Sequence, residues 1–224
     1  MPLLGFAHVS LVVATIAAAA ALSWLCQTRR AWVRPVRLAL GYGITGNELV
    51  WWVFRYSREG IHLNNLPLQL CDLTVWLTVV ACLTLMPTVV ECAYFAGVAG
   101  SGMAILTPNL WSPWPSYPAV YFFLAHGGVL VGSAALTFGR IVVPRPGAIR
   151  RVFGILAVYA ALIGAFNAVF GSNYMYLRHK PANPSLLDWL GPWPLYLASG
   201  MVVALLLFWL LWLPFRPPVA VSAT

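Results

Sequence analysis

Apolar residues dominate the chain in long stretches, and polar residues collect in the short segments between them. Seven stretches approach the roughly 20 apolar residues that a helix needs to cross a bilayer, and each is closed by Arg, Pro or a polar cluster. They cover residues 5–25, 36–55, 66–86, 88–106, 118–138, 149–170 and 194–213. The pattern predicts an all-α polytopic membrane bundle of about seven helices, in one domain that covers residues 1–224.

Composition and charge agree with a membrane protein and predict its orientation. Of the 224 residues, 61% are hydrophobic and only 8% are charged, which is far from the composition of a soluble domain. Nine of the 13 basic residues fall between spans on one side, and four (Arg55, Arg58, Arg178 and Lys180) fall on the other. Because cytoplasmic loops carry the excess of Lys and Arg, we expect the N-terminus outside and the C-terminus in the cytoplasm.

The net charge of +8 does not indicate a nucleic-acid partner. Its basic residues lie between the predicted helices and form no stripe with interleaved aromatic residues, which a nucleic-acid surface would show.

Several polar side chains fall at one depth inside the predicted spans. At a rise of 1.5 Å per residue, Glu48 lies roughly 10 Å from the outer end of the second span, and His126 lies at a comparable depth in the fifth. The full layer consists of Asn47, Glu48, Cys71, Asp72, His126 and Asn167. Polar groups inside a membrane are costly and usually face a bundle interior or a water-filled cavity, so the pattern predicts one enclosed site in the outer leaflet.

Cys71 and His126 are the members of this layer with the clearest chemistry. A thiol titrates at roughly pH 8.5 and needs a base or a cation to become a nucleophile, which His126 would provide. Cys and His together support acyl transfer through a thioester, and this chemistry requires neither a cofactor nor a metal. Gln69 or Glu48 would be available to orient the imidazole, whereas Asp72 points about 100° away from Cys71 around the helix.

Other interpretations remain open at this point. Glu48 and Asp72 are equally compatible with ion pairs to nearby arginines, and His126 with a hydrogen bond to a backbone carbonyl. A transporter or lipid-binding protein would use the polar layer as a substrate site. A metal-dependent lipid hydrolase would use the histidines, although the sequence contains no HxxxH or HExxH pair, the spacing typical of zinc ligands on a helix.

The segment GSNYMYLRHKPANPSLLDWLGPWPLY, residues 171–196, is rich in Asn, Pro and aromatic residues. Aromatic residues anchor such segments at the membrane interface. Arg178 and Lys180 in this segment are also candidates for contacts with anionic lipid headgroups.

Three motifs resemble those of a known family. They are LPLQLCDLT in the third span, LTPNLW followed by FFLAHGG in the fifth, and the 171–196 segment before the seventh. On these motifs the chain resembles the bacterial YwaF-like integral membrane proteins, which belong with the eukaryotic transmembrane protein 164 family of acyltransferases. The resemblance implies a lipid acyltransferase in which Cys71 carries the acyl chain and His126 is its base. It also implies transfer from a phospholipid to a lysophospholipid.

Overall fold

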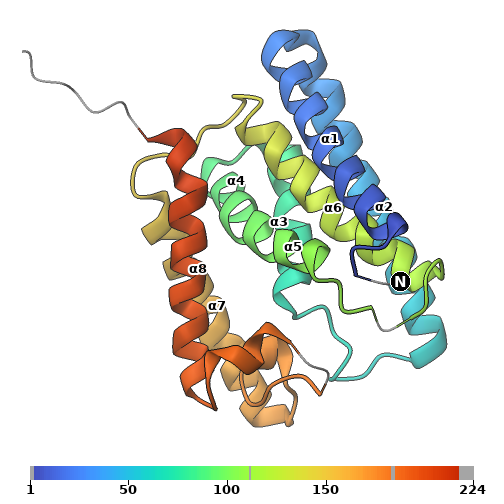
Figure 1. Ribbon diagram of the computed structural model, residues 1–224, viewed down its shortest axis with the longest axis vertical. Helices are drawn as coiled ribbons and strands as arrows, with labels where there is room; N and C mark the ends of the chain where they lie inside the picture. The colour runs from blue at the N-terminus through green and yellow to red at the C-terminus, as the bar shows by residue number, and fades with distance from the viewer. Residues whose placement is uncertain (1–2, 111, 183–184, 217–224) are drawn as a thin grey trace, which may run out of the picture.

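The computed structural model describes residues 3–110, 112–182 and 185–216, and in them the protein is all-helical (Figure 1). The α-helices are α1 (Phe6–Thr28), α2 (Val33–Glu59), α3 (Leu70–Thr84), α4 (Pro87–Cys92), α5 (Val98–Leu106), α6 (Tyr117–Thr137), α7 (Ala148–Phe170) and α8 (Leu195–Trp212). A π-helical turn, η2 (Ala93–Gly97), joins α4 to α5 in one continuous rod. Short 3₁₀ turns are η1 (Arg30–Trp32), η3 (Tyr174–Tyr176), η4 (Leu186–Leu190) and η5 (Leu213–Phe215).

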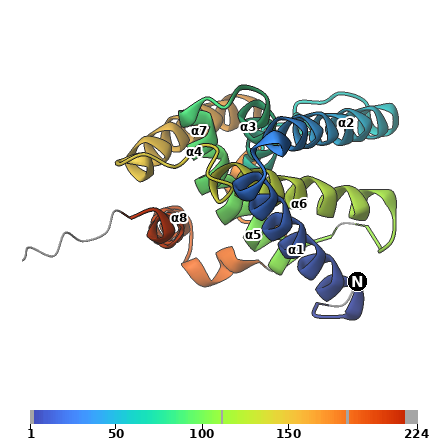
Figure 2. The same cartoon turned by 90° about the horizontal axis from the view of Figure 1, so that it is seen from above.

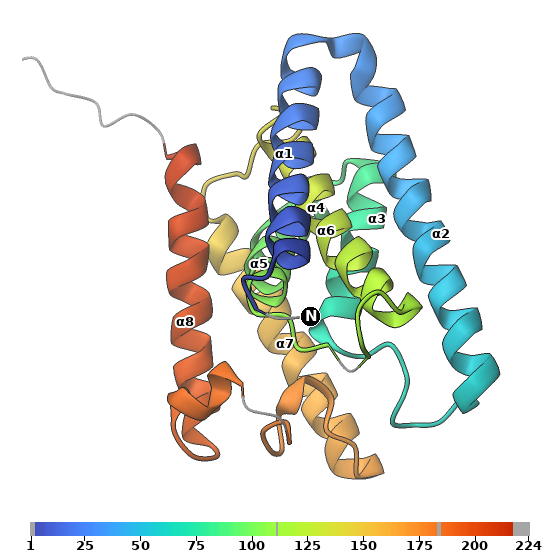
Figure 3. The same ribbon diagram turned by 45° about the vertical axis from the view of Figure 1, so that its right-hand side comes forward.

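The predicted polytopic membrane bundle is confirmed. Five helical segments are long and apolar enough to cross a membrane: Phe6–Thr28, Pro87–Leu106, Tyr117–Thr137, Ala148–Phe170 and Leu195–Phe215. Two further helices complete the bundle: α3 is apolar but has only 15 residues, and α2 carries ionisable residues along its length. Consecutive passes run in opposite directions (Figure 3). The end at which α3 and α6 begin is called the outer end below, after the predicted orientation.

Helix α6 lies at the centre, in contact with α1, α2, α3 and α5 (Figure 2). Two glycines set the distances between the central helices. A Cβ atom at Gly132 would lie 2.8 Å from Thr78 Cγ2, and a Cβ atom at Gly97 would lie 2.6 Å from Val129 Cγ1. Both distances are too short for carbon atoms, so these residues must be glycine for α3, η2 and α6 to pack as they do.

Helices α7 and α8 attach to the α4–η2 side of this centre. Tyr94 and Phe95 of η2 pack with Val152 of α7 and Phe208 of α8 in one buried cluster. A fully buried carboxylate, Glu91, fixes the start of α7 by accepting hydrogen bonds of 2.8–3.1 Å from Arg145 and Arg151. The hydrogen bonding with Glu91 raises the pKa of Arg145 above its ordinary value, so the pair stays charged.

The observed helix ends lie within a few residues of the predicted ones, and α2 and α3 show why they differ. α2 continues to Glu59, past the predicted end at 55, and stops where Gly60 adopts a φ of +72°. α3 begins at Leu70, later than the predicted 66, because a capping box forms there: the Asp72 carboxylate accepts a 3.0 Å hydrogen bond from the Gln69 N–H. Such caps satisfy backbone groups that the first helical turn leaves unpaired.

Candidate functional site

Cys71 and His126 lie on neighbouring helices that run in the same direction, α3 and α6. The two helices are aligned by Thr78, which packs against Gly132, and by Thr74, which shares the Gly97 contact with Val129. Residues three or four apart lie on one face of a helix. Cys71 lies one turn from Thr74 towards the outer end, and His126 lies one turn from Val129 in the same direction. The packing therefore places Cys71 and His126 at the same level of the bundle. In the described residues the two side chains do not hydrogen-bond each other.

The His126 ring is held through one of its two nitrogens. Nδ1 lies 2.8 Å from the carbonyl oxygen of Phe122, and the ring packs on the Phe122 ring with 4.3 Å between centroids. Because a carbonyl oxygen only accepts hydrogen bonds, Nδ1 carries the proton. With Nδ1 used in this way, the neutral imidazole would present an unprotonated Nε2, which is the form that a general base needs.

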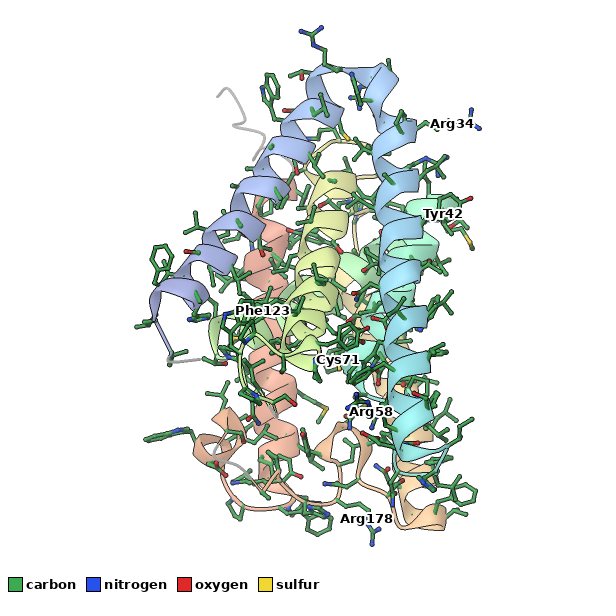
Figure 4. All side chains as sticks on the ribbon, turned by 90° about the vertical axis from the view of Figure 1, so that its right-hand side faces the viewer. Arg34, Tyr42, Arg58, Cys71, Phe123 and Arg178 are labelled. Atoms are coloured by element: carbon green, nitrogen blue, oxygen red, sulfur yellow. The ribbon has the colours of Figure 1, made fainter. Side chains whose placement is uncertain are left out.

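Cys71 differs from the other cysteines in its exposure. All four cysteines are free, and Cys26, Cys82 and Cys92 are buried, whereas Cys71 is exposed. Figure 4 shows Cys71 beside the outer end of α6. Below this level the helices are in close contact through Gly97, so the thiol lies where the packed centre of the bundle opens towards its outer end.

Glu48 is fully buried and binds a tyrosine that the depth pattern missed. The Tyr121 hydroxyl donates to both carboxylate oxygens, at 2.9 and 3.1 Å, and the Tyr121 ring stacks on Trp51 with 4.2 Å between centroids. Glu48 also interacts electrostatically with Asp72 and Cys71. It does not hydrogen-bond His126 in the described structure, so its direct partner is a phenol and not the imidazole.

Asn47, the neighbour of Glu48 in the predicted layer, has a different environment. Its side-chain Nδ2 is buried and has no hydrogen-bond partner among the described residues. It therefore does not share the hydrogen bonds of Glu48.

Asp72 and Asn167 of the predicted layer, together with Gln69, which was predicted as a possible orienting residue, hold the outer segments together. Gln69 Oε1 accepts a 2.8 Å hydrogen bond from the Met175 N–H. Asn167 holds the same segment through two 2.9 Å bonds, one to Tyr174 O and one from Tyr174 N. With the cap made by Asp72, these contacts place Gln69, Asp72 and Asn167 in the frame around the site.

A polar cleft of about 340 Å³ opens at the outer end of the bundle, beside the start of α3. Its lining residues are Asn64, Gln69, Gly171, Ser172, Asn173, Tyr174 and Tyr176. The Tyr174 hydroxyl ties its two walls together, because it donates to Leu63 O at 2.8 Å and accepts from Leu66 N at 2.7 Å. Burial raises the pKa of Tyr174, which keeps that hydroxyl protonated. A larger hollow of about 470 Å³ lies elsewhere, along Arg150–Val158 of α7.

The two basic residues predicted to meet headgroups are placed differently. Lys180 lies 3.7 Å from the Asp188 carboxylate and over the Tyr196 ring, and the Tyr196 hydroxyl in turn donates to Tyr176 O. Arg178 projects away from the bundle in Figure 4. Its guanidinium makes a long contact of 3.4 Å to Asn167 O, and its backbone N–H donates to Asn173 Oδ1 at 3.0 Å. Of these two basic side chains, that of Arg178 is the more available to a ligand.

Tyrosines are what the sequence pattern missed. Tyr121 binds Glu48, and Tyr159 of α7 donates a 3.0 Å hydrogen bond to Leu68 O, close enough to interact electrostatically with Cys71 and Asp72. Each of these tyrosines carries a hydroxyl inside an apolar span, and that polar group could have indicated a role near the site. An aromatic ring in a span is ordinarily interpreted as a packing residue, so the two were not predicted.

The histidines do not gather around a common point. His8 contacts Ile105 O at 2.7 Å and His62 contacts Glu59 O at 2.6 Å, while His179 contacts Asn173. Across residues 3–110, 112–182 and 185–216, no three His, Cys, Asp or Glu side chains form a group that would hold a metal ion.

A model of the TMEM164 family matches residues 3–213, which contain every helix of the bundle together with Cys71 and His126. Neither the curated proteins nor the solved structures contain a match to the chain.

Proposed function

The chain belongs to the TMEM164 family, and we propose that it is a membrane lipid acyltransferase. It would move a fatty acyl chain from a phospholipid to Cys71, as a thioester, and then to a lysolipid or another alcohol. The observation that carries the proposal is the alignment of α3 with α6, which sets Cys71 and His126 at one level, while the contact with Phe122 O engages Nδ1 of the imidazole and not Nε2. The proposed setting is the outer leaflet of a bacterial cytoplasmic membrane.

The two half-reactions use the same groups in opposite order. His126 Nε2 takes the thiol proton, and the thiolate attacks the ester carbonyl of the phospholipid. When the ester C–O bond breaks, the electron pair leaves with the lysolipid oxygen, which receives the proton from His126. An acceptor hydroxyl then gives its proton to His126 and attacks the thioester, and the departing thiolate is reprotonated. Since the thioester retains the energy of the donor ester, the cycle consumes no cofactor.

The polar cleft supports a lipid as the substrate. Gln69 lines the cleft and lies two residues before Cys71 on the first turn of α3. A phospholipid with its headgroup in the cleft and its chains along the apolar helices would therefore bring its ester groups towards the thiol. Arg178, and Lys180 when it is released from Asp188, would contact the phosphate through charge-assisted hydrogen bonds.

Intact-mass spectrometry after incubation with a diacyl phospholipid tests the proposal. Wild-type protein is expected to gain one acyl mass that neutral hydroxylamine removes, because hydroxylamine cleaves thioesters. Cys71→Ala is expected to gain none, and His126→Ala is expected to gain it about 100-fold more slowly or worse, since a general base contributes roughly 10²–10⁴-fold.

Cys82→Ala is the matched control, because Cys82 is also a free cysteine of α3 but is buried. It should acylate at the wild-type rate. If Cys71→Ala supports lipid turnover at the wild-type rate, Cys71 is not the nucleophile and the proposed mechanism is wrong.

A further inference from the structure

Ser101 of α5 is a buried residue, and its side chain makes no hydrogen bond to another residue in the described part of the chain. Its exposed fraction is 2%. Ser and Thr in membrane helices ordinarily donate to the carbonyl four residues earlier, and Ser23, Thr78 and Thr137 do so in this protein at 2.6–2.8 Å. Ser101 makes no such bond, so its environment needs another explanation.

The packing of α5 against α6 sets Ser101 opposite His126. The two helices are antiparallel, and three contacts fix their alignment. Ser133 donates a 3.0 Å hydrogen bond to Ala93 O, Gly97 meets Val129, and Ile105 packs with Phe122. Ser101 lies one turn after Gly97 and one turn before Ile105, and His126 lies between Val129 and Phe122. The Gly97–Val129 contact therefore lies on the inner side of Ser101 and His126, and the Ile105–Phe122 contact lies on their outer side.

The same layer includes Cys71. At the level of Gly97, three helices meet, because a Cβ atom there would lie 2.6 Å from Val129 and 3.7 Å from Thr74 Cβ. One turn outward on each helix stand Ser101, His126 and Cys71. The contact at Gly97 closes this layer on its inner side, and the exposed Cys71 shows that it is open on the outer side.

The π-helical turn η2 supports this alignment. Positions 93, 97 and 105 all contact α6, yet residues four apart drift by about 40° per step around a regular 3.6-residue helix. The extra residue that a π-turn accommodates offsets part of that drift. Such turns occur frequently at functional sites, and here the turn lies one helical turn below Ser101.

We propose that Ser101 is a further catalytic residue, which donates its hydroxyl hydrogen to the acyl carbonyl oxygen during transfer. The inference rests on the proposed acyltransferase function. When the Cys71 sulfur bonds to the carbonyl carbon, the π electron pair moves to the oxygen, and the Ser101 O–H stabilises that negative charge. The donor ester C–O bond then breaks, the carbonyl re-forms, and the hydrogen bond weakens. Ser101 keeps its proton throughout, while His126 transfers the proton from thiol to leaving group.

The test compares the rate of thioester formation and the thermal stability of full-length Ser101→Ala and Ser133→Ala. Ser101→Ala is expected to acylate about 100-fold more slowly with an unchanged KM, since removing one oxyanion donor costs roughly 10²–10³-fold in kcat. Its melting temperature should be close to that of the wild type, because the substitution removes no hydrogen bond between described residues. Ser133→Ala loses the bond to Ala93 and should show the opposite balance: lower stability, with a loss of rate much smaller than that of Ser101→Ala, because the Gly97 and Ile105 contacts still align the two helices.

Each outcome of this experiment has a definite meaning. If wild-type protein forms a thioester and Ser101→Ala forms it at the same rate, the inference is wrong while the proposed function stands. A Ser101-dependent adduct that resists neutral hydroxylamine would mean an oxygen ester, with Ser101 as the nucleophile, and would also overturn it. Absence of any adduct on wild-type protein contradicts the proposed function itself.

Discussion

At the scale of the residue, Glu48 shows how a carboxylate is accommodated inside the bundle. Its hydrogen-bond donor is Tyr121, which lies five positions before His126 on α6 and so points about 140° away around the helix. Glu48 and His126 therefore share a depth but face different neighbours. Depth can be counted along the sequence, whereas the direction of each side chain depends on how the helices are rotated against one another.

We expect the Glu48–Tyr121 pair to stabilise the fold without taking part in proton transfer. Tyr121→Phe should lower the free energy of unfolding by about 1–3 kcal/mol, because Glu48 remains buried without its donor. Glu48→Gln keeps an acceptor for Tyr121 and should retain the wild-type acylation rate. Melting temperature in detergent and the acylation assay measure the two effects.

Tyr117→Phe is the matched control for this pair. Tyr117 is on the same helix, and its hydroxyl is buried without a hydrogen-bond partner in the described residues, so its removal should leave stability unchanged. A large loss of acylation rate in Glu48→Gln, at unchanged stability, would instead make Glu48 part of the proton path.

At the scale of the element, the helices were largely predictable and their alignment was not. Apolar length and polar boundaries located every pass to within a few residues, and the capping box of Gln69 and Asp72 explains the later start of α3. The π-turn over Ala93–Gly97 leaves no mark on hydrophobic periodicity over so short a segment. The alignment of α5 with α6 depends on close contacts between helices, which the sequence of a single chain does not reveal.

Gly97 makes this alignment testable. A Cβ atom at Gly97 would lie 2.6 Å from Val129, while a Cβ atom at Gly100 meets nothing within 4 Å. Gly97→Ala should therefore destabilise the protein by about 1–3 kcal/mol through overpacking and slow acylation, because α5 and α6 must move apart directly below Cys71 and His126. Gly100→Ala should match the wild type in both assays. Equal melting temperatures for the two variants would contradict the tight contact.

At the scale of the whole molecule, charge is distributed unequally between the two ends of the bundle. Arg145 and Arg151 are engaged with the buried Glu91, yet the same end also carries Arg29, Arg30, Arg34, Arg37, Arg140, Arg150 and Arg216. The opposite end carries the polar cleft and the level of Cys71 and His126. The orientation of the bundle therefore decides which leaflet supplies the proposed lipid substrate.

Labelling of single cysteines on intact cells tests the orientation. Cys71→Ala is the starting variant, because the other three cysteines are buried. Thr28 and Ser57 are exposed at opposite ends of α1 and α2, so Ser57→Cys should react with a membrane-impermeant maleimide while Thr28→Cys should react only after the membrane is permeabilised. This follows from the rule that the basic loops stay in the cytoplasm. The reverse pattern would place the N-terminus inside and assign Cys71 and His126 to the inner leaflet, where the available lipids and acceptor alcohols differ.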